Sequence, residues 1–534
     1  MKYYFKKQYW KDQRLLLLVF LLLHIVIASV FISRQSITFD EMDYYAYSVH
    51  WAKGKAERTN RMYDSKTPLM VVAAIPRAIR QLVSPHYRAM DNGASDILAG
   101  RYVMVIFTIV AALYLFRWIR ILFPGDYWII PLLFFLFDPM VISYSMIITS
   151  DMASGACLLA TAFHFYRFFF GRSRLQLFYF SAWLAAGLLC KASLLYIIPL
   201  LLLVGIIYSM VRPGRQHLAK LMRAAAVSTL ITLLILNLSF YFAGTGQALS
   251  ATQWKSALFK SLSSAPLISD IPVPLPKSYL QGVDLLQYHG DLGAGYSEST
   301  HHGTYVNGKI KYQGGFWYYY LYVGFYKLPI ATLVLLFVGI IAILVSGRGA
   351  FRRTHCWYVI PLLFFSVVLS LFNPFQSGFR HFLLVYPFIF MAIAAGCHFF
   401  GSRRRIVMPV AFVLFLPMIV SAAVYFPWLM SYTNEFTGPK KLVFRKINDS
   451  SISYGQNRRE LRKFLAEHPD YQGMPVEPKA GKFIVSATEL TDFKSGRDCS
   501  WLTAFTPVAH YQYSMYLFEV SAADLRKLQQ NSRQ

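Results

Sequence analysis

Long apolar runs of about twenty residues recur along the chain, separated by short basic segments and long polar ones. The first, at 14–33, is long enough to cross a hydrocarbon core of ~30 Å as a helix. Ten further runs have a similar character, at 100–123, 127–146, 152–171, 175–190, 192–211, 221–244, 327–346, 355–372, 380–399 and 406–426. The pattern predicts a polytopic α-helical membrane protein with about eleven transmembrane helices.

The composition agrees with this interpretation. Hydrophobic residues make up 56% of the 534 residues and charged residues only 15%. A water-soluble domain cannot bury that much apolar surface, so most of the chain is expected in lipid.

Basic and acidic residues lie on opposite sides of the predicted membrane. With the N-terminus inside, the inner segments hold 20 Lys or Arg residues against two acidic residues. These segments are 1–14, 117–126, 167–174, 212–223, 346–355 and 401–405. The positive-inside rule then predicts a cytoplasmic N-terminus and an outer C-terminus. The net charge of +27 is explained by topology, and no nucleic-acid partner is expected because no such binding motif accompanies it.

Three long outer segments remain. Loops 34–99 and 247–326 belong to a transmembrane domain over 1–426, and the polar tail 427–534 can fold in water. A helical pattern at 458–465 and β-like runs at 483–486 and 513–520 predict a small C-terminal α/β domain on the outer side.

The first outer loop carries Asp40-Glu41 just beyond the first apolar run. A carboxylate near a low-dielectric surface can act as a general base toward a hydroxyl, while its neighbour orients an acceptor. The alternative is that both acids only cap a helix beginning at Met42, where the helix dipole favours negative charge.

Cations lie at the predicted outer ends of several apolar runs. Lys66 precedes Pro68, Lys191 separates two runs, and Arg380 begins another. Guanidinium and ammonium groups there can hold a lipid phosphate, and Arg380 is the best candidate because it can bind bidentately. The alternatives are snorkelling or interfacial anchoring for Lys66 and Arg380, a turn marker for Lys191 and, for the nearby Asp151, a helix N-cap.

Several short motifs occur in a fixed order: Phe39-Asp40-Glu41, Lys66-Thr67-Pro68-Leu69, Ser150-Asp151, Lys191, Gly314 to Tyr320, Lys327-Leu328-Pro329 and Gly378-Phe379-Arg380-His381. In this order and topology the chain resembles the GT-C glycosyltransferases, and is most similar to their protein-mannosyltransferase and aminoarabinose-transferase branch. The resemblance covers nearly all of 1–435 and continues through 434–456. One departure is Thr67, where many members have a second proline.

The resemblance implies a polyprenyl-phosphate sugar donor, transfer on the outer side with inversion, and a glycan, lipid or protein acceptor. It assigns the base to Asp40, with Glu41 assisting. The implied phosphate-binding residues are Lys66, Lys191, Arg380 and His381. The implied substrate-binding residues are Tyr63, Asp151, Trp317 and Tyr319, although the aromatic residues could equally anchor the interface. The resemblance also favours a bacterial inner membrane, with the tail in the periplasm.

No cofactor is clearly indicated. The second loop offers a possible divalent-metal ligand set in His289, Asp291, Glu298, His301 and His302, but the spacing matches no firm metal motif. Two other functions compete with a transferase. A transporter or flippase of lipid-linked sugars predicts ionisable residues near the membrane midplane, where this chain has mainly Asp138 and His164. A membrane scaffold does not explain the ordered outer acids and cations.

Overall fold

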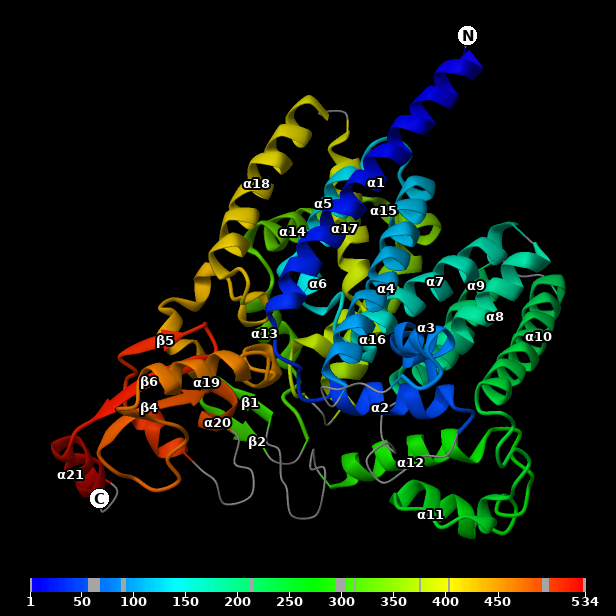
Figure 1. Cartoon of the computed structure of the whole chain (residues 1–534). Coiled ribbons are helices and arrows are strands. Elements are labelled where there is room, and N and C mark those ends of the chain that lie inside the picture. Colours follow the sequence, from blue (N-terminus) through cyan, green and yellow to red (C-terminus); the bar gives the residue numbers. More distant parts are fainter. Residues whose placement is uncertain are drawn as a thin grey trace.

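The protein is described by a computed structural model. It covers residues 2–55, 68–87, 93–171, 173–211, 215–292, 304–311, 314–373, 376–401, 404–491 and 499–531. Helices dominate these residues, and a small sheet lies toward the C-terminus (Figure 1).

The apolar runs form helices because a backbone in lipid must satisfy its hydrogen bonds internally. Within the described residues, four helical stretches are long and apolar enough to cross a membrane: Asp12–Arg34, Ala94–Leu122, Leu221–Ser239 and Gly347–Leu371. Four shorter apolar helices accompany them, at Ala192–Val204, Ile330–Val345, Tyr386–Phe399 and Pro409–Tyr425. A mostly helical protein with several apolar helices is therefore observed.

The main helices of this part are α1 (Lys2–Arg34), α4 (Ala94–Leu122), α5 (Ile129–Leu136), α6 (Pro139–Tyr144), α7 (Ser150–Gly171), α8 (Arg174–Leu188), α9 (Ile197–Val211), α10 (Arg215–Ser239), α13 (Tyr319–Lys327), α14 (Ile330–Val345), α15 (Gly347–Ala350), α16 (Cys356–Leu371), α17 (Tyr386–Phe399) and α18 (Arg404–Tyr425). Short 3₁₀ turns η2 (Ala192–Tyr196) and η5 (Phe379–Leu384) precede α9 and α17, and the π-turn η4 (Phe351–His355) precedes α16.

The predicted span at 127–146 is not one continuous helix. It is divided into α5 and α6 at Asp138, whose carboxylate accepts a hydrogen bond from the backbone N–H of Met140 (2.9 Å) and so caps α6. Pro139 occupies the first turn of α6, where the missing N–H costs nothing. The break explains why an ionisable side chain is buried here.

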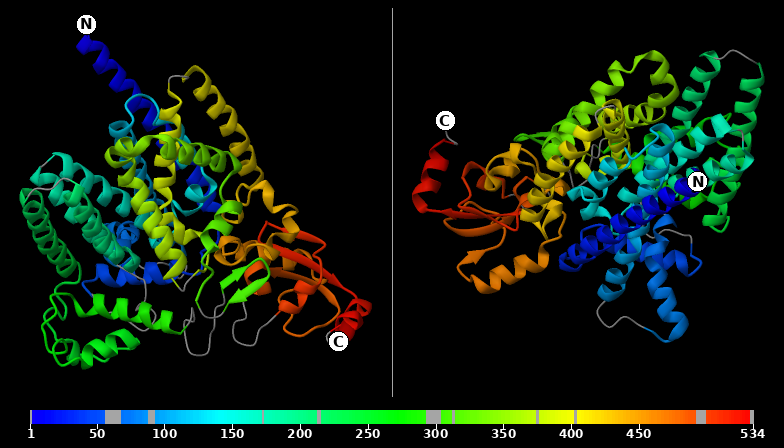
Figure 2. Two further views of the ribbon diagram at one scale, coloured as in Figure 1. Left: turned by 180° about the vertical axis from the view of Figure 1, so that it is seen from behind. Right: turned by 90° about the horizontal axis from the view of Figure 1, so that it is seen from above.

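The first outer loop forms α2 (Glu41–Ala52), η1 (Pro68–Ala74) and α3 (Ile75–Val83), and the second forms η3 (Leu249–Ala251), α11 (Ala257–Ser264), α12 (Lys277–Asp291) and the hairpin β1 (Thr304–Val306) and β2 (Lys309–Lys311). The hairpin turns at Asn307-Gly308, both with positive φ, as a tight two-residue turn requires. Figure 1 shows α2, α11, α12 and the C-terminal sheet at one end of the molecule and the N-terminus at the other, and the rear view in Figure 2 agrees.

The tail begins with the turns η7 (Leu429–Ser431), η8 (Glu435–Thr437), η9 (Lys440–Arg445) and η10 (Asp449–Ser451). It continues with α19 (Arg458–Glu467), β3 (Tyr471–Gln472), β4 (Gly481–Ser486), α20 (Ala487–Thr491), η11 (Ser500–Ala504), β5 (Ala509–Tyr511), β6 (Met515–Val520) and α21 (Ala522–Asn531). The strands form one sheet in the order β3-β4-β6-β5, with Phe483 opposite Phe518 at the centre of the antiparallel β4–β6 pair. Both rings are buried, so the sheet has its own apolar face.

Lys327, at the end of α13, ties the tail to the helical part. Its side chain is fully buried, and Nζ donates to the carbonyls of Met430 (2.9 Å), Tyr432 (2.7 Å) and Ser451 (2.8 Å). Three acceptors match the three N–H donors of an ammonium group. The segment from 430 to 451 is thereby fixed against the membrane-facing helices.

We expect Lys327→Met to lower the free energy of unfolding by about 3 kcal/mol or more, because three buried carbonyls lose their donor at once. The measurement is thermal unfolding of the detergent-purified chain. Lys309→Met, at an exposed lysine of β2, is the control. Equal unfolding temperatures for the two variants would contradict this account of the junction.

Candidate functional site

Asp40 is the residue before α2 and occupies the N-cap position, but its side chain makes no capping hydrogen bond. Its carboxylate instead faces Arg380 of η5, with 3.1 Å between Oδ2 and Nη1, and accepts a hydrogen bond from the hydroxyl of Tyr454. The Asp40 side chain remains 36% exposed, whereas that of Arg380 is only 8% exposed. Asp40 therefore lies at the helix start, where the dipole favours negative charge, but its carboxylate faces a buried cation and makes no hydrogen-bonded cap.

Glu41 has a different environment although it is the next residue. It is completely buried and receives hydrogen bonds from Nε and Nη2 of Arg101 (2.8 and 2.5 Å). The backbone N–H groups of Thr38 and Ile148 also donate to it, at 2.8 and 3.1 Å. Burial alone would raise the pKa of Glu41, but the charge and hydrogen bonds of Arg101 and the two N–H groups outweigh burial and lower it.

A second group of charges surrounds Asp151 in the first turn of α7. Oδ1 lies 2.8 Å from Nζ of Lys191, and Oδ2 lies 3.5 Å from Nη1 of Arg380. Burial would raise the pKa of the Asp151 carboxyl, but the positive charges of Lys191 and Arg380 hold it well below its usual range. Asp151 therefore stays ionised and binds both cations, which is more than a helix N-cap requires.

His381 completes this group as a neutral imidazole. Lys191 Nζ lies 3.1 Å from His381 Nδ1, and an ammonium can only donate, so Nδ1 is the acceptor. The ring proton is then on Nε2, which donates to the hydroxyl of Ser377 (3.2 Å).

Gly155 allows these elements to come together. It lies one turn after Asp151 on α7, and a Cβ added there would overlap the backbone carbonyl of Leu383 in η5. The missing side chain lets α7 approach η5 closely enough for Asp151 to reach Arg380.

The tail contributes two residues that the sequence analysis did not assign to the site. Tyr454 hydrogen-bonds both Asp40 and Arg380, and the Arg380 guanidinium lies 4.2 Å from the Tyr454 ring centroid. Ser450 Oγ accepts from Arg380 Nε (3.2 Å). The only sequence signal for Tyr454 was its place in the segment 434–456, through which the resemblance continues.

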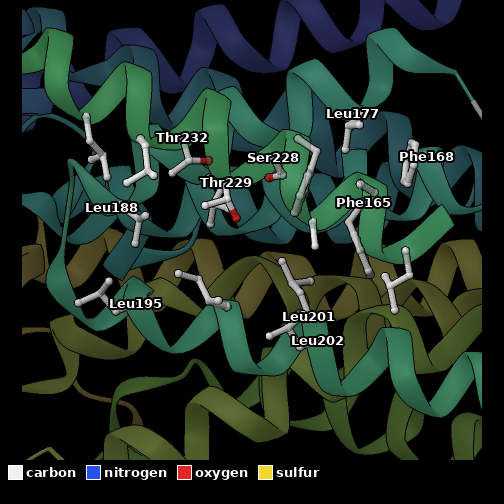
Figure 3. A pocket seen from close by; sticks show the side chains of 18 of the residues that line it. Phe165, Phe168, Leu177, Leu188, Leu195, Leu201, Leu202, Ser228, Thr229 and Thr232 are labelled. Carbon is white, nitrogen blue, oxygen red and sulfur yellow. The ribbon is translucent and has the colours of Figure 1, made fainter. Parts of the chain in front are cut away.

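An apolar cavity of about 350 Å³ lies between α7, α8, α9 and α10 (Figure 3). Leu188 and Leu195 lie at one end and Phe168 and Leu177 at the other. Lys191 sits in the turn between Leu188 and Leu195, so one end of the cavity is adjacent to the charged cluster. The mainly apolar lining suits a segment of hydrocarbon chain.

The other residues that were singled out from the sequence lie in different environments. Trp317 is exposed, whereas Tyr319 is packed in the core against Tyr320. Tyr63, Lys66, Glu298, His301 and His302 lie outside the described residues. Asp291 accepts a hydrogen bond from the backbone N–H of Ala257 (2.9 Å), and His289 is buried in α12. Among the described residues, no group of three or more His, Cys, Asp or Glu side chains is arranged to hold a metal ion.

No family model and no curated relative matches the sequence. The fold does match solved structures. The archaeal oligosaccharyltransferase AglB from Archaeoglobus fulgidus, in complex with an inhibitory peptide and a dolichol-phosphate, is 13% identical with a TM-score of 0.47 over 78% of this chain. The match spans 56% of the archaeal protein, little more than half its length.

ArnT from Cupriavidus metallidurans is similar over nearly the whole chain. In the apo state it is 12% identical with a TM-score of 0.34, covering 96% of this chain and 99% of ArnT. Bound to undecaprenyl phosphate it is 13% identical with a TM-score of 0.33, covering 95% and 98%. The scores lie below 0.5, so the likeness to these proteins is remote.

The Glu41–Arg101 pair predicts an acid-dependent stability. A carboxyl whose pKa is lower in the folded chain stabilises the fold above its unfolded pKa, near 4.5, and loses that contribution as the pH falls through its folded pKa. We expect Glu41→Gln to be less stable at pH 7 and to lose less stability between pH 5 and 3 than the unchanged chain, by thermal unfolding in detergent. Asp270→Asn, at an exposed carboxylate, should behave like the unchanged chain. Parallel pH profiles for Glu41→Gln and the unchanged chain would contradict the assignment.

Proposed function

We propose that the chain is a membrane glycosyltransferase that moves a sugar from a polyprenyl-phosphate donor to a hydroxyl-bearing acceptor, with inversion. The observation that carries the proposal is the 3.1 Å contact of the partly exposed Asp40 with the buried Arg380, itself linked through Asp151 to Lys191. One side of the cluster offers a base, which can remove the acceptor proton. The other side offers cations, which can stabilise a phosphate leaving group.

In the proposed reaction Asp40 removes the proton from the acceptor hydroxyl. The acceptor oxygen forms a bond to the anomeric carbon as the bond from that carbon to the phosphate oxygen breaks. The polyprenyl phosphate departs with an added negative charge, which Lys191 and Arg380 stabilise. No acid is then required at the leaving oxygen, which agrees with the neutral His381 and the fully ionised Asp151.

The apolar cavity of Figure 3 is the proposed place of the polyprenyl chain. A chain lying between α8 and α9 would bring its phosphate to the Lys191 turn. Before the donor arrives, the negative charge of Asp151 offsets the repulsion between the buried cations Lys191 and Arg380, and so keeps both side chains in place.

Other residues take supporting parts in the proposal. Glu41 positions Asp40 by anchoring the start of α2 to Arg101 of α4, and does not itself touch substrate. Lys66 as a further phosphate ligand, and Tyr63 and Trp317 as substrate contacts, remain predictions. The acceptor can be a cell-envelope glycan, a lipid or a protein.

The proposed setting is a bacterial inner membrane crossed by about eleven helices. The N-terminus would lie in the cytoplasm, residues 1–426 would form the transmembrane domain, and 427–534 would form a periplasmic α/β domain. Figure 1 supports this arrangement, because the C-terminal sheet and α2 lie at the end away from the N-terminus.

A lipid flippase is the alternative, and the apolar cavity alone would suit it. The two ionisable residues that favoured a transporter have structural partners, however. Asp138 caps α6, and His164 forms hydrogen bonds with Tyr114 (2.8 Å) and Gln176 (2.8 Å). A flippase also has no use for a base beside the cations, so removing that base separates the two functions.

We expect Asp40→Asn to lower turnover by about 10²- to 10⁴-fold, the usual contribution of a general base. The assay incubates membranes containing the chain with polyprenyl-phosphate sugars extracted from bacteria, and follows their consumption by mass spectrometry. Asp270→Asn, also in an outer loop but distant in sequence from the cluster, is the control. Near-normal turnover in Asp40→Asn would refute the proposed base.

Arg380→Lys should lower turnover about 100-fold although the charge is kept. An ammonium cannot at once replace the guanidinium contacts with Asp40, Asp151 and Ser450. The same assay, with undecaprenyl-phosphate binding measured in parallel, distinguishes lost turnover from lost donor binding. Arg445→Lys, at an exposed arginine of the tail, serves as the matched control. Full activity in Arg380→Lys would exclude the proposed role of the guanidinium.

A further inference from the structure

A second cavity, of about 590 Å³, lies far from the Asp40 cluster, at the other end of α4. It opens between the ends of α4 and α7 and the start of α8. Its polar lining consists mainly of Arg117, Arg120, His164, Arg167, Gln176 and Tyr179. We refer to it as the arginine cavity.

The position of the arginine cavity follows from helix geometry. Arg101, which binds Glu41 beside Asp40, and Arg120 are both on the continuous helix α4. Nineteen residues at 1.5 Å per residue place them about 28 Å apart, close to the thickness of a bilayer's hydrocarbon core. The arginine cavity therefore lies at the membrane face opposite to the proposed transfer site. Its three arginines belong to the segments 117–126 and 167–174, which the charge pattern assigns to the inside.

The chemistry of the cavity is that of an anion site. Three of its lining residues are arginines, and no carboxylate is among the described residues that line it. Arg120 packs its guanidinium 5.2 Å from the Phe116 ring centroid, which holds the group at the wall.

Neutral donors surround these charges. Gln176 Oε1 faces His164 Nδ1 (2.8 Å), and this directs the amide NH₂ of Gln176 away from the histidine. Tyr179 adds a hydroxyl. The apolar part of the wall comes from Phe116, Ile121 and Phe163, so polar donors and hydrocarbon surface adjoin each other.

We infer that the arginine cavity binds the phosphate of a lipid headgroup at the membrane face opposite to Asp40. Guanidinium groups bind phosphate bidentately, and basic pockets between helices at the inner face suit anionic headgroups. The volume falls within the range of small-ligand sites, and the adjoining aromatic and aliphatic wall can contact acyl chains. This site is separate from the proposed transfer reaction, and its existence does not depend on that reaction.

The test measures lipid binding by native mass spectrometry of the full-length chain in detergent after removal of endogenous lipid. The probes are phosphatidylglycerol, a neutral diacylglycerol of the same acyl chains, and inorganic phosphate as competitor. We expect Arg117→Gln/Arg167→Gln to weaken phosphatidylglycerol binding about 10- to 30-fold, since each basic residue near an anionic lipid contributes roughly fivefold. Both arginines are exposed at helix ends, so the fold should survive their replacement.

The matched control is Arg348→Gln/Arg353→Gln, which removes the same charge from another predicted inner segment, at exposed positions outside this cavity. Loss in the first variant with retention in the control supports the site. If millimolar inorganic phosphate displaces the lipid, the cavity binds a phosphate ion and the inferred preference for a lipid is wrong. If it does not, the site requires the lipid chains as well as the phosphate, as inferred. Equal losses in the two variants, or diacylglycerol binding as tight as phosphatidylglycerol, would overturn the inference.

Discussion

The buried guanidinium of Arg380 is the interaction on which the site depends. It contacts Asp40 before α2, Asp151 at the start of α7, and Ser450 and Tyr454 of the tail. A buried cation is tolerated only when carboxylates and hydrogen-bond acceptors surround it. Three regions far apart in the sequence are therefore brought together by one charge, and the cluster cannot form unless all three are in place.

The same requirement explains the surrounding architecture. Lys327 holds the tail segment that carries Ser450, and the Glu41–Arg101 pair fixes the start of α2 that carries Asp40. Gly155 permits the close approach of α7 and η5. Each of these contacts fixes one of the groups around Arg380, among them the partly exposed carboxylate of Asp40.

The sequence predicted the helical membrane character and five members of the cluster, namely Asp40, Asp151, Lys191, Arg380 and His381. Hydropathy and loop charge suffice for the membrane character and for the positions of the charged residues, because apolar length and the ends of apolar runs are local properties. Asp151 and His381 were assigned to the site only through the family resemblance. The division of the 127–146 run has a local signal in Asp138-Pro139, a capping residue followed by a first-turn proline, which hydropathy alone does not register.

Long-range relations could not be obtained in this way. Tyr454 is 414 residues from Asp40, and nothing local to either residue indicates their hydrogen bond. Likewise, Asp40 and Glu41 are adjacent and chemically alike, yet the first is partly open and the second is buried. Their environments differ through contacts that are distant in sequence: Arg101, sixty residues away on α4, binds Glu41, whereas Arg380 and Tyr454 contact Asp40.

The central claim is that Lys191 and Arg380 receive a polyprenyl phosphate beside Asp40. A cryo-electron microscopy structure of the full chain with added undecaprenyl phosphate tests it most directly. The account predicts phosphate density within hydrogen-bond distance of Lys191 and Arg380, with the isoprenoid chain entering the cavity between Leu188 and Leu195. Phosphate density elsewhere, with the Asp151–Lys191 and Asp40–Arg380 contacts unchanged and that cavity empty, would contradict it.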